Sequence, residues 1–216
     1  MIYPKVIFFD LDGTLTDSKQ GIVNSIRYTL DKMKLHKDNI NLELLIGPPL
    51  SESFEKYFGL DNKTARYAVA VYREYYAVKG IFENKLYPEI EELLKTLKEN
   101  DKMLACVTSK AAYYAEQILK HFKIAKYFTR LVGSNMDLTC THKIDLIKIA
   151  LSHFPEHNNK EFIMIGDRAD DIIGARTNNI ASISILYGYG TAEEIKVENP
   201  DYIVKSVGEL RKILIQ

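Results

Sequence analysis

The sequence predicts an α/β fold: a Rossmann-like parallel sheet with helices on both faces, plus a small all-helical cap inserted after the first strand. Short apolar runs, which are typical of strands buried on both faces, alternate with longer stretches whose apolar residues repeat at helical spacing. Several runs stop at polar residues, and binding groups collect at such strand ends in open parallel sheets. One long helical interval breaks the alternation and indicates the insertion.

The apolar runs define the expected strands. The first is residues 6–9, which stops at Asp10, and the second is residues 103–107, which stops at Thr108. A later run, residues 162–165, stops at Gly166 and Asp167. The full set of expected strands is residues 6–9, 103–107, 130–133, 162–165, 182–186 and, as a short edge strand, 202–204.

Helical patterns fill the intervals between the later strands. Pro88 opens the first of them, and proline suits the first turn of a helix because its missing N–H would have no partner there. These expected helices are residues 89–100, 111–122, 143–154, 170–178 and 207–214. Strand followed by helix, repeated along the chain, implies parallel strands joined by right-handed crossovers.

Residues 16–85 form the inserted segment, which shows helical patterns and no convincing strand. The patterns cover residues 22–33, 42–46, 51–58 and 62–78. The segment is much longer than an ordinary connection between a strand and a helix. We therefore expect a core domain of residues 1–15 and 86–216 and a helical cap domain of residues 16–85.

The composition argues against several classes of binding partner. The chain has 216 residues, with 29 Lys and Arg against 29 Asp and Glu, so it lacks the charge that favours nucleic-acid polymers or membrane surfaces. No segment approaches the ~20 apolar residues that span a bilayer, and the N-terminus lacks a signal-peptide core. The two cysteines, Cys106 and Cys140, predict neither a disulfide scaffold nor a zinc site. We expect a cytoplasmic monomer or weak dimer.

The first chemical motif is Asp10-Leu11-Asp12-Gly13-Thr14. Two acids at i and i+2 after a buried strand face the same way while the chain stays extended. Paired carboxylates repel each other, so one is usually protonated or both hold a cation. Gly13 allows a sharp turn whose N–H groups can bind an anion. A polar turn leading into a helix cap is the alternative, but it does not need Asp10 and Asp12.

The second motif begins at Gly166-Asp167 and includes Asp171. Asp167 and Asp171 are four residues apart, so a helical turn can direct both toward one cation. Clustered carboxylate oxygens suit Mg²⁺. Acids at a helix start also stabilise the helix dipole, which is the structural alternative. Because a second acidic motif follows another strand, metal binding is favoured.

Two weaker signals complete the set. In Thr108-Ser109-Lys110, hydroxyls and an ammonium group follow a strand and can hold phosphate oxygens, although serine and threonine also cap helices. Lys143 opens an expected helix, where a lone lysine is normally a solvated surface charge. A phosphate dianion brought to the carboxylates would, however, need compensation beyond one Mg²⁺.

Together these motifs resemble the haloacid dehalogenase superfamily, and within it the phosphoglycolate-phosphatase-like branch. Residues 10–15, Thr108, Lys143 and the pair Asp167 and Asp171 match the four motifs of that superfamily in order and spacing. The match spans the whole chain. The insertion resembles the small mobile cap of the superfamily, and residues 46–50, which include Gly47, resemble the cap loop that reaches toward the substrate.

The resemblance implies a Mg²⁺-dependent phosphatase acting on a small phosphorylated metabolite. Asp10 would attack phosphorus and form an aspartyl phosphate, while Asp12 would protonate the leaving group and then activate water. Mg²⁺ would be held by Asp10, the backbone carbonyl of Asp12, and Asp167, with support from Asp171. Thr108 and Lys143 would act as further catalytic residues by holding phosphoryl oxygens. The expected substrate-binding residues are Thr14, Gly47, Thr108, Ser109 and Lys143.

The sequence leaves three alternatives for the substrate and the reaction. Phosphoglycolate leads on resemblance alone, although the cap shows no paired-arginine clamp for a second carboxylate. A 5′-nucleotidase is the first alternative, since Phe54, Tyr57 or Phe58 could stack a base if exposed. A β-phosphoglucomutase-like phosphomutase is the second, although Thr14 fits the phosphatases better. A binding module without catalysis is disfavoured, because Asp10 and Asp12 are both present.

Overall fold

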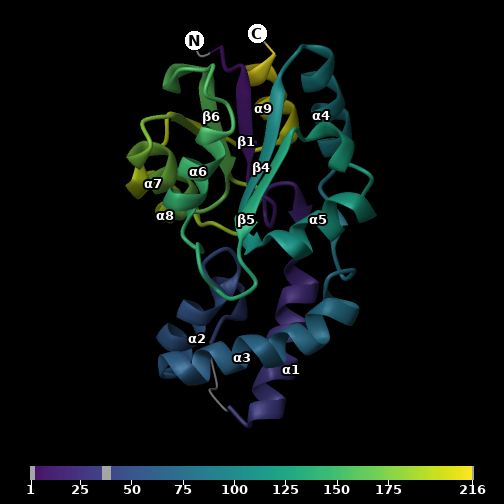
Figure 1. The fold of residues 1–216 in the computed structure, drawn as a ribbon, viewed down its shortest axis with the longest axis vertical. Coiled ribbons are helices and arrows are strands. Elements are labelled where there is room, and N and C mark those ends of the chain that lie inside the picture. The colour runs from purple at the N-terminus through teal and green to yellow at the C-terminus, as the bar shows by residue number, and fades with distance from the viewer. Residues whose placement is uncertain (1–2, 36–39, 216) are drawn as a thin grey trace.

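The computed structural model describes residues 3–35 and 40–215, and it contains the predicted parallel sheet. The strand order is β5-β4-β1-β6-β7-β8, and every neighbouring pair is parallel (Figure 1). The strands are β1 (Val6–Phe9), β4 (Met103–Ala111), β5 (Arg130–Ser134), β6 (Phe162–Gly166), β7 (Ala181–Ile185) and β8 (Tyr202–Val204).

The central strand β1 aligns the chemical motifs. Phe9 is level with Cys106 of β4 on one side and with Ile165 of β6 on the other. The backbone N–H of Asp10 continues this ladder by donating to the carbonyl of Ile165 at 2.9 Å. The residues that follow β1, β4 and β6 therefore meet at one edge of the sheet, as expected for parallel strands.

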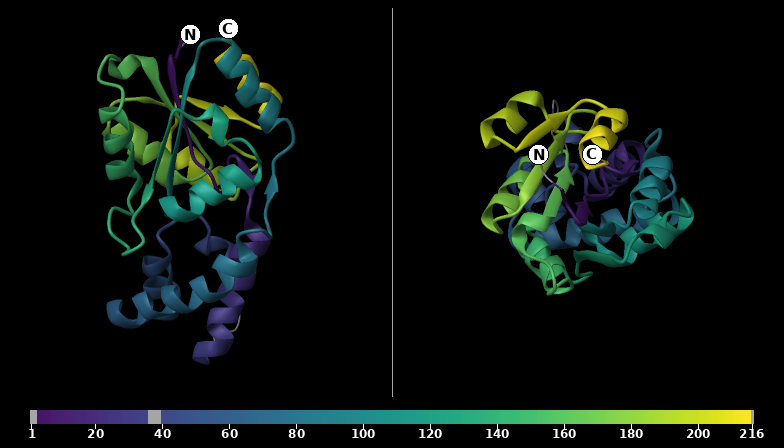
Figure 2. Two further views of the ribbon diagram at one scale, coloured as in Figure 1. Left: turned by 45° about the vertical axis from the view of Figure 1, so that its right-hand side comes forward. Right: turned by 90° about the horizontal axis from the view of Figure 1, so that it is seen from above.

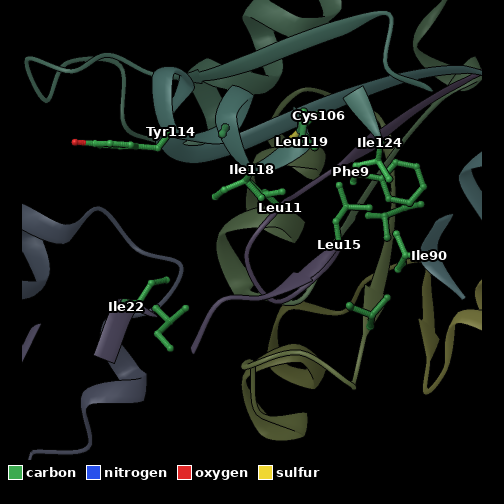
Figure 3. Close-up of a cluster of buried hydrophobic side chains, with 14 of the residues drawn as sticks. Phe9, Leu11, Leu15, Ile22, Ile90, Cys106, Tyr114, Ile118, Leu119 and Ile124 are labelled. Atoms are coloured by element: carbon green, nitrogen blue, oxygen red, sulfur yellow. The ribbon is translucent and has the colours of Figure 1, made fainter. Parts of the chain in front are cut away.

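Helices cover both faces of the sheet (Figure 2). In β1 the side chains alternate: Ile7 and Phe9 belong to the core cluster on the side of α4, α5 and α9, whereas Val6 and Phe8 belong to the cluster on the side of α6 and α7. Figure 3 shows part of the first cluster, where Phe9 lies near Ile90. These helices are α4 (Ile90–Glu99), α5 (Ala112–His121), α6 (Lys143–Ser152), α7 (Ala169–Thr177) and α9 (Val207–Leu214).

The inserted segment lies beyond the carboxyl ends of the strands (Figure 1). Its helices are α1 (Lys19–Met33), a 3₁₀ turn η1 (Leu42–Leu45), α2 (Leu50–Phe58), α3 (Asn62–Tyr75) and a π-helical turn η2 (Tyr76–Gly80). α3 packs against both α1 and α2. As predicted from the sequence, we propose that residues 16–85 act as a cap domain on a core of residues 1–15 and 86–216.

The cap is not purely helical where it joins the core. The two connecting segments pair as a short antiparallel ladder, β2 (Thr16–Asp17) with β3 (Lys85–Leu86). The sequence showed no strand here, because two residues are too few to produce an alternating apolar pattern. The ladder places the entry and exit of the cap side by side, which is the geometry of a two-segment hinge.

Other elements also differ from the sequence-based expectation. β4 extends to Ala111, beyond the predicted end at residue 107, and its pairing with β5 is irregular between Thr108 and Ala111. Helix α8 (Ala192–Glu198) was not predicted, because seven residues are too few to establish a helical period. Among the residues that the structure describes, no helix combines the length and apolarity needed to cross a membrane.

Candidate active site

Three acidic side chains converge at the carboxyl edge of the sheet. Carboxylate oxygens of Asp10, Asp167 and Asp171 all lie within 4.8 Å of one another, and the three residues are at most 5% exposed. Asp10 follows β1, Asp167 follows β6, and Asp171 lies in the first turn of α7. The side chain of Asp12, the fourth predicted metal residue, is not part of this group.

Burial and mutual repulsion shift the pKa values of two of these acids. The pKa of Asp167 is raised to about 8, chiefly by burial and then by the charges of Asp10 and Asp171. The pKa of Asp10 is raised to about 6 by burial, and the ammonium group of Lys143 partly offsets that effect. Negative charge therefore exceeds positive charge at this cluster. A hard divalent cation fits the donor set, since three buried carboxylates offer the oxygens that Mg²⁺ prefers.

Lys143, the first residue of α6, is a buried member of the cluster rather than a surface charge. Its Nζ lies 2.7 Å from Oδ1 of Asp10 and 2.8 Å from Oδ1 of Asp171. It also donates to the carbonyl of Val107 at 2.9 Å. Burial lowers the pKa of Lys143, but the two carboxylates more than offset this, so that pKa is raised overall. The ammonium group is therefore charged and fixed beside Asp10.

Asp12 pairs with a lysine that was not among the predicted site residues. Oδ2 of Asp12 lies 2.6 Å from Nζ of Lys110, and both side chains are 9% exposed. The same ammonium group lies 4.8 Å from the ring centre of Tyr76 in the cap. The sequence did contain the signal, an ammonium group after the second expected strand, but only the structure shows that this lysine reaches Asp12.

Two loops close tightly around Asp167. Gly13 has a φ of +87°, and a Cβ at that position would overlap the carboxylate of Asp167. The backbone N–H of Tyr189 donates to Oδ2 of Asp167 at 2.7 Å, and Oγ1 of Thr14 donates to Oδ1 at 3.2 Å. Thr14 is fully buried and its hydroxyl is bound to Asp167, and its contact with the substrate stays a prediction.

A cleft between the core and the cap lies next to Asp12. On the core side Ser109 and Lys110 line it, and on the cap side Gly47 lines it at a φ of +106°. Thr108 is buried within β4, where the irregular pairing begins, and its hydroxyl accepts from the backbone N–H of Lys110 at 3.3 Å. Buried tyrosines form much of the remaining wall, namely Tyr72, Tyr76 and Tyr114.

The aromatic residues proposed to stack a base do not line this cleft. Phe54 is fully buried and Phe58 is 8% exposed, and their rings contact each other inside the cap at a centroid distance of 5.7 Å. The expected stacking role is therefore wrong for both, because their spacing on one helix face directs them into the cap interior. Tyr57 is half-buried and lies outside the lining of the cleft.

Arginines connect the cap to the core around the cleft. Arg168 donates from Nη1 to the carbonyl of Ile46 and from Nε to Glu194 of α8 at 2.9 Å. Arg66 of α3 donates to the carbonyl of Asp137 at 2.7 Å. Arg168 thus joins the start of α7 to the cap and to α8.

The fold and the site define an α/β enzyme in which a buried aspartate is held beside a lysine and two further acids. Residues 7–185 match the sequence model of the haloacid dehalogenase-like hydrolases, and the chain belongs to this family.

Three similar proteins refine the class. A 5′-nucleotidase of Pseudomonas aeruginosa is 37% identical over 216 residues, covering 98% of this chain and 96% of the relative. A phosphoglycolate phosphatase of Vibrio parahaemolyticus is 30% identical over 222 residues, covering 97% and 96%. The crystal structure of a predicted phosphatase from Clostridium acetobutylicum matches with a TM-score of 0.94 at 44% identity, covering 100% and 99%. The branch predicted from the sequence is confirmed, and the enzyme is a phosphatase.

Proposed function

We propose that this phosphatase hydrolyses small phosphomonoesters in two steps, through an aspartyl phosphate on Asp10. The placement of Asp10 supports the proposal: it directly follows the central strand, is buried beside Lys143, and stands two residues from Asp12. Splitting one displacement into two lowers the barrier of each step. Lys143 holds Asp10 in place and offsets the charge that an approaching phosphate dianion would otherwise meet.

In the first step, an oxygen of Asp10 forms a bond to phosphorus while the bond from phosphorus to the ester oxygen breaks. Asp12 gives its proton to the departing oxygen, so the leaving group departs as an alcohol. In the second step, Asp12 takes a proton from water, the oxygen of which attacks the phosphorus. Asp10 is then released as a carboxylate and inorganic phosphate leaves. The ion pair with Lys110 has to open for Asp12 to carry its proton.

The side chains of Asp10, Asp167 and Asp171 would hold Mg²⁺. A bound Mg²⁺ supplies charge neutralisation for the phosphoryl oxygens. The chain itself orients these ligands: Thr14 and the backbone of Tyr189 fix both oxygens of Asp167, and the backbone N–H of Arg168 donates to Asp171 at 3.1 Å. Such outer contacts keep metal ligands in position.

The position of the cap favours compact substrates. The cleft lies between the cap and the carboxyl edge, so a closed cap can exclude water during the chemistry. We propose phosphoglycolate-like esters as the leading substrates. A 5′-nucleotide is the second candidate, because Tyr72, Tyr76 and Tyr114 give the cleft an aromatic wall and one similar protein is named a 5′-nucleotidase.

A substrate panel tests the proposal. We expect Mg²⁺-dependent release of phosphate from phosphoglycolate, a 5′-nucleotide and a sugar phosphate, compared by kcat/KM. Glucose 1-phosphate separates hydrolysis from phosphomutase chemistry, in which isomerised sugar would form without net phosphate release. Full activity after complete chelation of metal would contradict the role of the acid cluster.

Asp12→Asn tests the proton-transfer step separately. The variant should lose less activity on p-nitrophenyl phosphate than on alkyl phosphates, because an acidic leaving group needs little protonation. An equal loss on both kinds of ester would show that Asp12 mainly orders its loop.

A further inference from the structure

One cationic side chain of the cap faces the cleft without an acidic partner. The charged residues that line the cleft are Asp12, Lys110 and Arg73. Asp12 and Lys110 neutralise each other at 2.6 Å. Within residues 3–35 and 40–215, Arg73 has no carboxylate at ion-pair distance, and its Nη1 donates to the backbone carbonyl of Met136 at 2.6 Å. A guanidinium group has five N–H donors, so most of them remain available to a ligand.

The remainder of the lining is neutral. Side chains of Tyr72, Tyr76 and Tyr114 form one part, and the hydroxyls of Ser109 and Ser134 contribute polar groups. A charge beside such a partly apolar wall attracts an opposite charge more strongly than a fully solvated one does. An anionic group entering this cleft meets two cationic side chains: Lys110, which Asp12 engages until their ion pair opens, and Arg73 on the cap side, which has no carboxylate partner among the described residues.

We propose that Arg73 is a specificity-determining residue that binds an anionic group, such as a carboxylate, on the leaving-group side of the substrate. The inference rests on the proposed function and extends it. The phosphoryl group is expected at Asp10 and Lys143, and the ester oxygen has to lie beside Asp12, which protonates it. The rest of the leaving group then extends into the cleft that Asp12 borders, and Arg73 stands on the cap side of that cleft.

Arg66 provides a matched control on the same helix. It lies two turns before Arg73 in α3 and makes an equivalent bond, from Nη2 to the carbonyl of Asp137 at 2.7 Å. Both arginines thus tie the cap to the loop between β5 and α6. Arg66 is not part of the cleft lining. Any effect that comes only from weakening this cap contact should appear in both variants.

The experiment compares two esters that differ in one group: 2-phosphoglycolate, which carries a carboxylate, and 2-hydroxyethyl phosphate, which carries an alcohol. The measured quantity is the ratio of their kcat/KM values. We expect wild type to favour the carboxylate by about tenfold or more, the range for one charge-assisted hydrogen bond. Arg73→Gln should reduce this ratio about tenfold through KM, Arg73→Lys should retain part of it, and Arg66→Gln should leave it in place.

A binding measurement separates this proposal from the proposed chemistry. In an Asp10→Asn background with Mg²⁺ present, calorimetry gives the Kd of both esters without turnover, and Arg73→Gln should reduce the ratio of the two Kd values similarly. If the ratio is the same with and without Arg73, or if both arginine variants change it equally, the proposal is wrong. If wild type hydrolyses none of these esters, the proposed function fails, and the Kd ratio still decides the role of Arg73.

Discussion

At the scale of residues, the main feature of the site is an excess of buried negative charge. Asp10, Asp167 and Asp171 lie together, the one lysine in contact with Asp10 and Asp171 is Lys143, and the pKa values of Asp10 and Asp167 rise to about 6 and about 8. Buried carboxylates without full compensation are costly. A cation bound among these carboxylates therefore stabilises the folded protein, whereas ionisation of the carboxylates without a cation destabilises it.

The nucleophile can be tested with an isosteric change. Asp10→Asn keeps the shape of the side chain but removes the charged oxygen that, in the proposed mechanism, attacks phosphorus, so we expect kcat to fall by about a thousandfold or more. Steady-state kinetics with p-nitrophenyl phosphate measures this loss, and circular dichroism checks that the fold is retained. Turnover like that of wild type, with deamidation excluded by mass spectrometry, would rule out Asp10 as the nucleophile.

The raised pKa values predict how stability depends on pH without metal. Between the ordinary value of 3.8 and the raised value of about 8, the folded protein holds a proton on Asp167 that the unfolded chain has lost. This contribution therefore favours folding at low pH and is lost as the pH rises toward 8. In thermal melts with chelator, Asp167→Asn should gain in Tm relative to wild type as the pH is raised from 5 to 8.

Added Mg²⁺ should reverse this trend in wild type. Because metal binding displaces protons from carboxylates, Mg²⁺ should raise the Tm of wild type more at pH 8 than at pH 5. Asp167→Asn should show a smaller rise at both values. A difference in Tm between the two proteins that does not change with pH would contradict the assigned charge state of Asp167.

At the scale of elements, the close packing of the cap depends on one glycine in its first helix. A Cβ at Gly21 of α1 would overlap the carbonyl oxygen of Gly80 in η2. Gly80 in turn lies against the hydroxyl of Ser25 on α1. The two backbones therefore approach more closely than any other residue type at position 21 would allow.

A pair of glycine substitutions tests this packing. Gly21→Ala should destabilise the protein by about 1–3 kcal/mol, because the new methyl group has to push two backbones apart. Gly208→Ala in α9 is the control: a Cβ there has its nearest neighbour at 3.9 Å, so the change should be neutral or slightly stabilising. Denaturant unfolding measures both. Equal stability of the two variants would show that α1 and η2 can separate without cost.

At the scale of the whole molecule, we propose that the cap limits which substrates reach Asp10. The two-stranded ladder β2–β3 joins cap to core at one point, while Arg168 and the α3 arginines bind the cap to core loops elsewhere. Asp10, the proposed nucleophile, lies under this assembly and is 5% exposed. A substrate therefore has to fit between cap and core, or the cap has to move.

This arrangement predicts discrimination by size. We expect compact phosphomonoesters to be cleaved, whereas a phosphopeptide and the diester bis(p-nitrophenyl) phosphate should be at least about a hundredfold poorer in kcat/KM, because neither lets the cap close over the phosphoryl group. Comparison with p-nitrophenyl phosphate measures this. Efficient hydrolysis of the phosphopeptide would mean that the cap does not close during turnover.

The sequence by itself determined the features that depend on local pattern. Continuous apolar runs identified the parallel strands. Asp10 follows the run 6–9, and Asp167 and Asp171 follow the run 162–165. These acids indicated one site, because parallel strands bring their carboxyl ends to the same edge of the sheet. Lys143 was found only because the acids gave a reason for a cation. The resemblance then supplied the family, which the comparisons confirmed.

Only the tertiary structure decided the contacts between distant segments. Lys110 of β4 pairs with Asp12, which follows β1, and Thr14 bonds Asp167, which follows β6, so both contacts join segments far apart in the sequence. The burial of Phe54 and the exposure of Arg73 to the cleft depend on how the cap helices sit on one another and on the core. Periodicity reports which face of an element is apolar, but it carries no information about which distant group that face meets.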